Sequence, residues 1–204
     1  MKVLKSLIFL LVLSFSIVSF SFAAEYTIDA DHSKVLFTIK HLGISSVSGE
    51  FQKFSGSFNF DPQSIEASTA NAKIDTSSIN TSVAKRDEHL KSPDFLDAAK
   101  FPEMTFSSKK ITPVSAKRFK VSGDLTLHGV TQEVELDVKL GGLVKDPWGS
   151  ERAAFTAAAK IDRRRFGVVW NKTLETGGLV VGNDIKIRLE VEGIKKAAET
   201  APSK

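Results

Sequence analysis

The stretch GDLTLHGVTQEVELDVKL, residues 123–140, decides the fold. Apolar and polar side chains alternate along it, both before and after the His128–Gly129 pair. A period of two residues is that of a β-strand that buries one face and exposes the other. We therefore predict two strands joined by a turn at His128. Their apolar face can either pack against a solid core or line a cavity, and the rest of the sequence bears on that choice.

The same alternation recurs along most of the chain. Besides this hairpin, it marks a short segment near Tyr26 and residues 35–39, 54–60, 70–74, 104–106, 119–127, 155–161 and 185–191. Eight or nine half-buried strands in succession are typical of a closed or double-layered all-β fold. We predict a single all-β domain over residues 24–195.

One segment, SVAKRDEHLKS at residues 82–92, breaks the alternation. It predicts a short helix with Ser82 as its N-cap and with Val83 and Leu90 on one face. This helix interrupts the strands and does not alternate with them. The pattern therefore favours an antiparallel β-barrel with a short helical insertion over a parallel α/β sheet.

The first 23 residues predict a secretory signal peptide. Lys2 and Lys5 precede an apolar run that reaches Phe22, and Ser21 and Ala23 are small residues at a plausible cleavage site. An uncleaved membrane anchor is the alternative, which we disfavour because the run barely reaches spanning length. Residues 196–204 lack large apolar side chains and predict a flexible tail.

Composition excludes several classes of protein. The chain contains no cysteine, so the fold depends on its core without disulfides. Its formal net charge is +4, and falls to +2 without Lys2 and Lys5. Such a balanced charge argues against a nucleic-acid partner.

Side-chain size and polarity favour a cavity inside the barrel. A barrel of about eight strands can be filled by side chains or can hold one small ligand. After residue 23 the chain has eleven phenylalanines but one tyrosine and two tryptophans, so its interior offers few hydrogen-bonding groups. We expect a long hydrocarbon as the guest, held by burial of apolar surface. The expected channel lining is Phe37, Ile39, Phe58, Phe60, Phe106, Phe119, Leu125, Leu127, Phe155, Ala157 and Trp170.

Cations follow two of the apolar series. The alternation that ends at Ile161 continues to Arg163 and Arg165, and the alternation through Ile39 continues to His41. Such cations could meet an anionic head group, with arginine suited to phosphate. Alternatively the strand ends at Asp162 and both arginines are solvated. The segment 163–183, which carries Trp170, either plugs one barrel end or forms a lid over the ligand.

No catalytic or metal-binding motif is present in the sequence. The four histidines, His32, His41, His89 and His128, lack zinc-like spacing, and there is no nucleophile elbow, phosphate loop or dinucleotide fingerprint. We expect no cofactor other than a bound lipid, and we expect His128 to be a turn or rim residue. An enzymatic role is unsupported by any motif.

Several stretches together resemble one family. They are YTIDADHSKVLFTIKHLG, RDEHLKSPDFLDAAKFPEMTF, LTLHGVTQEVEL and WNKTLETGGLVVGNDIKIRLEVEGI, which lie between residues 26 and 194. In them the chain closely resembles the YceI-like family of secreted, lipocalin-like lipid-binding proteins. The matching positions are Arg86, Asp87, His89, Phe95, Phe101, Pro102, His128, Gly129, Phe166, Gly167, Trp170 and Asn171. Arg165 departs from the acidic residue that relatives commonly carry before the Phe-Gly pair.

The resemblance implies an elongated, eight-stranded lipocalin-like barrel in the bacterial periplasm, with an apolar channel for a polyisoprenoid or other long-chain amphiphile. It also implies links to isoprenoid quinone metabolism, transport or storage, and to stress response. The candidate head-group contacts become His41, Arg86, His89, Arg163 and Arg165, although Arg86 and His89 could equally hold the helix onto the barrel.

Three functional hypotheses follow. The first is a carrier that binds an isoprenoid quinone or a prenyl phosphate. The second is a lipocalin-fold enzyme that acts on a lipid or quinone, and the third is a solid-core interaction module. For the carrier we expect at most transient membrane contact, and a monomer or homodimer.

Overall fold

The computed structural model of the chain describes residues 23–175 and 177–197. The predicted signal peptide, apart from Ala23, and most of the predicted tail lie outside the described residues. Within those residues, no helix is both long and apolar enough to span a membrane.

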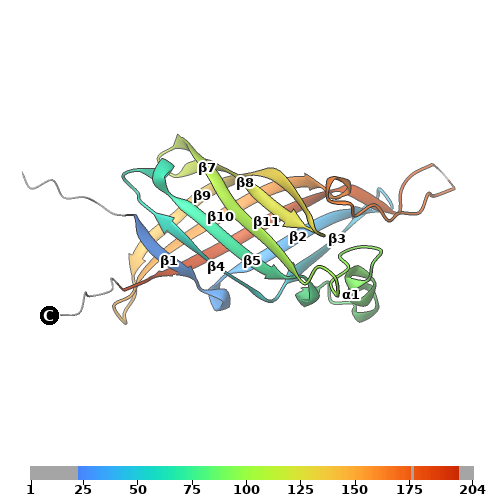
Figure 1. The fold of residues 1–204 in the computed structure, drawn as a ribbon, viewed down its shortest axis with the longest axis horizontal. Helices are drawn as coiled ribbons and strands as arrows, with labels where there is room; N and C mark the ends of the chain where they lie inside the picture. Colours follow the sequence, from blue (N-terminus) through green and yellow to red (C-terminus); the bar gives the residue numbers. More distant parts are fainter. Residues whose placement is uncertain (1–22, 176, 198–204) are drawn as a thin grey trace, which may run out of the picture.

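The described residues form eleven strands and one α-helix (Figure 1). The strands are β1 (Ala24–Ile28), β2 (Lys34–His41), β3 (Ser45–Phe51), β4 (Phe54–Phe60), β5 (Thr69–Asp75), β6 (Ile79–Asn80), β7 (Glu103–Ser115), β8 (Arg118–Leu127), β9 (Val130–Lys145), β10 (Glu151–Asp162) and β11 (Val181–Lys195). The helix α1 spans Ala84–Lys91, and a 3-10 turn, η4, spans Arg163–Phe166.

The hairpin predicted from residues 123–140 is present as β8 and β9. Leu127 pairs with Val130, so His128 and Gly129 form a two-residue turn. Both have positive φ, 53° and 73°, as a type I′ turn requires. A side chain at position 129 would be doubly unfavourable, because its Cβ would also lie 2.4 Å from the Phe101 ring.

The sheet closes into an eight-stranded antiparallel barrel, which confirms the predicted fold class. The closed ring follows the order β1, β4, β5, β7, β8, β9, β10, β11, and β1 pairs with β11 to complete it. Strands β2, β3 and β6 extend the sheet from β11. The sequence analysis missed β3 and β6, since β3 carries serine and glycine at most positions. At Gly49 the Phe37 ring leaves no room for a side chain, since an added Cβ would lie 2.5 Å from that ring.

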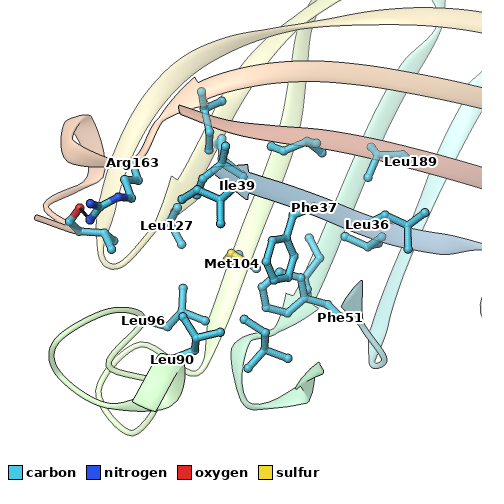
Figure 2. Close-up of a pocket in the computed structure, with 18 of the residues that line it drawn as sticks. Leu36, Phe37, Ile39, Phe51, Leu90, Leu96, Met104, Leu127, Arg163 and Leu189 are labelled. Carbon is cyan, nitrogen blue, oxygen red and sulfur yellow. Dashed lines mark hydrogen bonds between the residues drawn. The ribbon is translucent and has the colours of Figure 1, made fainter. Parts of the chain in front are cut away.

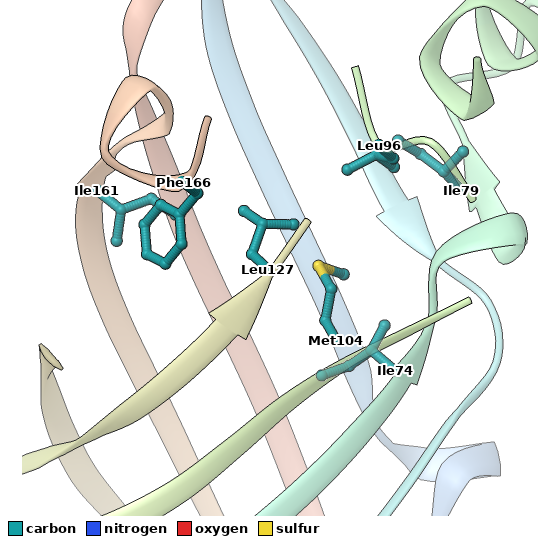
Figure 3. Packing of buried hydrophobic residues seen from close by; sticks show 7 residues of the cluster. All are labelled: Ile74, Ile79, Leu96, Met104, Leu127, Ile161 and Phe166. Carbon is teal, nitrogen blue, oxygen red and sulfur yellow. The ribbon is translucent and has the colours of Figure 1, made fainter. Parts of the chain in front are cut away.

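The two ends of the elongated barrel differ (Figure 1). At one end, here called the mouth end, lie α1, the β2–β3 turn and the segment 163–180. At the opposite end, here called the plugged end, lie the start of β1 and the β9–β10 hairpin. The hydrophobic core also forms separate clusters toward the two ends. A cluster that includes Met104, Leu127 and Phe166 lies toward the mouth end (Figure 3), and aromatic residues fill the plugged end.

The helix is present, but its predicted cap is wrong. The N-cap residue is Val83, which has no hydrogen-bonding side chain, and Ser82 precedes it with φ of 62°. Val83 is 46% exposed, so it does not share a buried face with Leu90. Instead, Asp87 in the first turn accepts a hydrogen bond from the backbone N–H of Thr81 (2.9 Å) and another from its hydroxyl. These bonds tie the helix to the end of β6.

Candidate ligand-binding cavity

An apolar cavity of about 380 Å³ occupies the mouth half of the barrel. Phe37 and Ile39 reach into it from β2, and Leu90 and Leu96 face it from the α1 side (Figure 2). The alternation in β2 explains this placement, because its odd-numbered residues pair with inward-facing residues of β11. The volume lies within the ~300–1,000 Å³ typical of small-molecule sites.

Six residues of the predicted channel lining lie on this cavity. They are Phe37, Ile39, Phe106, Leu125, Leu127 and Trp170. Neighbouring wall residues include Val35, Met104 and Leu189. Strand parity already placed Val35 and Leu189 on the inner face. Leu90, Phe95 and Leu96 come from α1 and the segment after it, where strand parity gives no information.

Five other residues expected in the channel lining lie elsewhere. They are Phe58, Phe60, Phe119, Phe155 and Ala157, which point inward but lie off the cavity wall. The four phenylalanines pack in apolar clusters toward the plugged end. Their parity was predicted correctly, but parity cannot tell a hollow stretch of barrel from a filled one. Whether these phenylalanine side chains contact one another depends on how the strands that carry them are placed in the barrel.

Arg163 is buried, with 1% of its surface exposed. It donates hydrogen bonds from Nε to the carbonyl of Gly182 (2.9 Å) and from Nη1 to the carbonyl of Val168 (2.8 Å). Burial lowers the pKa of its guanidinium below the ordinary value. The solvated interpretation is wrong, because Arg163 is buried and its guanidinium holds the late segment against β11. Arg163 also lies on the cavity wall, so a head-group contact there stays a prediction. Arg165 is exposed and donates to Gln132 (3.0 Å), away from the cavity wall.

Arg86 and His89 contribute to the cavity from α1. Arg86 donates from Nε to the Thr81 hydroxyl (2.8 Å) and from Nη2 to its carbonyl (2.9 Å), so it also fastens the helix. The His89 Nε2 lies 2.8 Å from an oxygen of Asp94. These contacts match the structural role that the sequence analysis left open for both residues, and they leave both at the cavity.

Aromatic rings join α1 to the late segment at the mouth. The His89 ring meets Phe95 and Trp170 edge-on, with centroid distances of 5.0 and 5.1 Å. Phe95 and Trp170 are themselves 5.0 Å apart. His41 also lines this part of the cavity. The polar side chains of the mouth therefore include His41, Arg86, His89 and the indole of Trp170.

The late segment, residues 163–175 and 177–180, packs into the mouth end of the barrel and borders the cavity. Phe166 and Val168 are buried, whereas Trp170 lies on the cavity wall and Val169 is exposed. Asn171 holds the segment like a strand partner: its Nδ2 donates to the Val181 carbonyl (2.6 Å) and its Oδ1 accepts from the Val181 N–H (3.1 Å). This geometry explains the asparagine without involving a ligand.

A charged network closes the plugged end. The Arg152 guanidinium contacts Asp29 (2.8 Å), Asp146 (2.8 Å) and Glu192 (2.6 Å). The Arg152 hydrogen bond lowers the pKa of Asp146 below its ordinary value of 3.8. Burial raises the pKa of Asp29, but hydrogen bonds from His32 and Arg152 outweigh that effect and lower it overall. Asp29, His32 and Glu192 have the spacing of metal ligands, yet Arg152 contacts two of them. The sequence analysis missed this network because its members are far apart in the chain.

A closed barrel with an apolar internal cavity is an architecture that binds small hydrophobic ligands. Within that class, the chain belongs to the YceI-like family, because the YceI-like domain matches residues 26–193. A YceI protein of Salmonella arizonae is 40% identical over 176 residues, which covers 85% of this chain and 88% of that protein. The family membership predicted from the sequence is confirmed.

Solved structures show the same barrel. The YceI protein of Campylobacter jejuni is 36% identical, with a TM-score of 0.67 over 78% of this chain and 90% of that one. A polyisoprenoid binding domain from Saccharophagus degradans, implicated in plant cell wall breakdown, has a TM-score of 0.63 at 16% identity. The match covers 85% of this chain and 99% of that domain. At that identity the likeness concerns the fold alone.

Proposed function

We propose that this protein is a periplasmic carrier that binds a long-chain isoprenoid lipid, an isoprenoid quinone or a prenyl phosphate, in its barrel cavity. The observation that carries the proposal is the distribution of polarity. Most of the cavity wall is aliphatic and aromatic, and His41, Arg86 and His89 lie on it at the mouth. A prenyl lipid has a matching arrangement, with a long apolar chain and a polar group at one end.

Burial of the chain would supply most of the affinity. Transfer of apolar surface out of water contributes roughly 25 cal/mol per Å². Branched prenyl units suit a wall of Ile, Leu, Val and Phe side chains. The Saccharophagus degradans domain, which is named as polyisoprenoid binding, supports the same class of ligand for this fold.

At the mouth, we assign the head group to His41, Arg86, His89 and Trp170. The Nη1 of Arg86 and the indole N–H of Trp170 are donors that suit a phosphate or a quinone carbonyl. Arg163 also lies on the cavity wall, but backbone carbonyls engage its donors, and Arg165 is exposed away from the wall; we therefore leave both out of this assignment. Delivery through the mouth would require transient contact with a membrane, and the predicted signal peptide supports a location in the periplasm.

We favour binding over catalysis in this cavity. Most of the surface along its wall is apolar, and the chain carries no catalytic motif that would use the few polar side chains on that wall. The His89 ring is engaged by Asp94, Phe95 and Trp170, which suits a positioning role at the mouth. An enzyme acting on the lipid would lose turnover on replacement of His41 or His89 while its fold stayed intact.

Two alanine substitutions test the proposal. Ala72 lies on the cavity wall and Ala157 lies off it, although both face inward. We expect Ala72→Phe to fill the cavity and weaken binding of a prenyl lipid at least tenfold with little loss of stability. Ala157→Phe should instead overpack a filled region and cost about 1–3 kcal/mol of stability. Native mass spectrometry would measure binding, and urea unfolding would measure stability.

The lipid that the purified protein carries provides a second readout. Organic extraction of the purified protein, followed by mass spectrometry, should yield a prenyl lipid from wild type and less from Ala72→Phe. If wild type neither carries such a lipid nor takes one up from host membranes, the carrier proposal fails.

A further inference from the structure

The inner end of the cavity stops at a layer of aromatic rings. Ile28 and Val191 form part of the cavity wall, and both pack against the cluster that contains Phe58 and Phe155. The Phe58 and Phe155 rings meet edge-on, with centroids 5.3 Å apart. A ligand chain that runs inward from the mouth therefore meets Ile28 and Val191, with these two rings packed directly behind them.

Further aromatic side chains complete the layer. Tyr26 stacks on Phe58 at 5.0 Å, and Phe60 meets Phe155 edge-on at 5.1 Å. Phe119, on β8, meets Phe155 edge-on at 6.1 Å. The three contacts of Phe155 have the ring angles and spacing of edge-to-face aromatic packing, whereas Tyr26 and Phe58 are stacked. Phe155 contacts three other rings and is the centre of the layer.

A second hollow lies beyond this layer, at the plugged end. Tyr26 and Phe60 form its inner wall, and its rim includes Leu143, Glu151 and Lys195. Leu143 and Val144 on its rim are exposed, so this hollow opens to solvent at the end of the barrel.

The barrel wall around the layer is built from small residues. Gly193 lies against Phe58 and Tyr26, where an added Cβ would come within 2.5 Å of the Phe58 ring. Ala153 and Ala157 precede and follow Phe155 on the inner face of β10. Because these wall residues are small, the aromatic rings occupy most of the barrel interior at this level. The position of the rings therefore determines where the cavity ends.

We propose that Phe58 and Phe155, which pack behind Ile28 and Val191, set the maximum length of lipid chain that the protein holds, because they fill the barrel beyond the inner end of the cavity. This inference rests on the proposed function. Each further CH₂ group that is buried raises affinity about fourfold. Affinity should rise with chain length until the chain reaches the rings, and then level off because additional units cannot be buried.

Binding of a prenyl alcohol series tests the inference. Dissociation constants would be measured for geraniol, farnesol, geranylgeraniol and longer polyprenols with the full mature chain. We expect Phe155→Ala to move the plateau by at least one isoprene unit, so that the first chain beyond the wild-type plateau binds more than tenfold tighter. Phe155→Leu, which keeps more of the apolar core, should shift the plateau less in the same direction.

Two further variants test whether a shifted plateau reflects a limit on ligand length or a general loss of core packing. Val191→Phe adds a ring at the cavity floor and should shorten the longest chain that gains affinity. Phe101→Ala is the matched control, because Phe101 packs on His128 at the mouth end and lies off the cavity wall. It should reduce stability and leave the plateau unchanged.

The outcomes distinguish this inference from the proposed function. If prenyl alcohols bind but the plateau is the same in wild type, Phe155→Ala, Phe155→Leu and Val191→Phe, the rings do not set the length and the inference is wrong. If no prenyl alcohol binds to wild type, the proposed function fails and the inference fails with it.

Discussion

Arg163 is the residue whose role depends most on its surroundings. Strand parity placed it on the inner face, where its charge suited a head group. The structure buries the guanidinium against the carbonyls of Val168 and Gly182, so its hydrogen bonds hold the late segment to the start of β11. A buried arginine with its donors engaged contributes to structure more than to recognition.

Replacement of Arg163 separates these two roles. We expect Arg163→Met to remove the donor to the carbonyls of Val168 and Gly182 and to cost about 1–3 kcal/mol in the free energy of unfolding. Affinity for a prenyl phosphate should change little. Urea unfolding and native mass spectrometry would measure the two quantities. Arg164→Met is the matched control, because Arg164 is exposed and pairs with Asp162 at the surface. Normal stability with lost phosphate affinity would instead make Arg163 a head-group contact.

At the scale of an element, α1 shows how a short helix with an apolar N-cap stays in place. Eight residues are too few to be stable as an isolated helix. Asp87 and Arg86 both bond to Thr81, and His89 packs against Phe95 and Trp170. Tertiary contacts therefore hold the helix beside the mouth, where it supplies part of the cavity wall.

Loss of the Asp87 bonds should release α1 without unfolding the barrel. Asp87→Ala removes the acceptor for the Thr81 N–H, a hydrogen bond to a charged group worth about 1.5–3 kcal/mol. We expect faster trypsin cleavage after Lys85 and Lys91, with the barrel strands still protected. Glu88→Ala provides the comparison, since Glu88 is exposed and pairs with Lys91 in a surface contact. Equal cleavage rates in the two variants would contradict a fastening role for Asp87.

For the whole molecule, closure of the barrel depends on a short seam. Strand β1 pairs with β11 through three residues, and the Asp29 N–H donates to the Glu192 carbonyl (2.8 Å) beside them. The Arg152 network links this seam to the β9–β10 hairpin through Asp146. The network therefore joins three separate parts of the chain at the plugged end.

This network predicts a characteristic response to acid. The pKa values of Asp29 and Asp146 lie below 3.8, so their contribution to stability is present above that pH and is lost as the pH falls through their lowered pKa values. We expect Arg152→Met to lower Tm at neutral pH, and we expect the gap from wild type to narrow below pH 3.8. Arg188→Met, which breaks an exposed pair with Glu190, should show a small gap. A Tm gap for Arg152→Met that is the same at all pH values would contradict this account.

The sequence by itself determined the all-β class, the barrel, the helical insertion, the family and the inward parity of almost every strand. These properties follow from local rules, because alternation and turn chemistry are encoded by neighbouring residues, as in the His128–Gly129 turn. For the same reason it located Phe37, Ile39 and Leu127 on the wall that became the cavity.

Only the tertiary structure decided where the barrel is hollow and where it is filled. Parity puts Phe37 and Phe155 on the same inner face, but Phe155 meets the rings of Phe58, Phe60 and Phe119 from other strands, whereas Phe37 borders open space. The burial of Arg163 and the Arg152 network likewise depend on contacts between residues distant in the chain. Packing is a property of the volume that several strands enclose together, and the periodicity of a single strand carries no information about that volume.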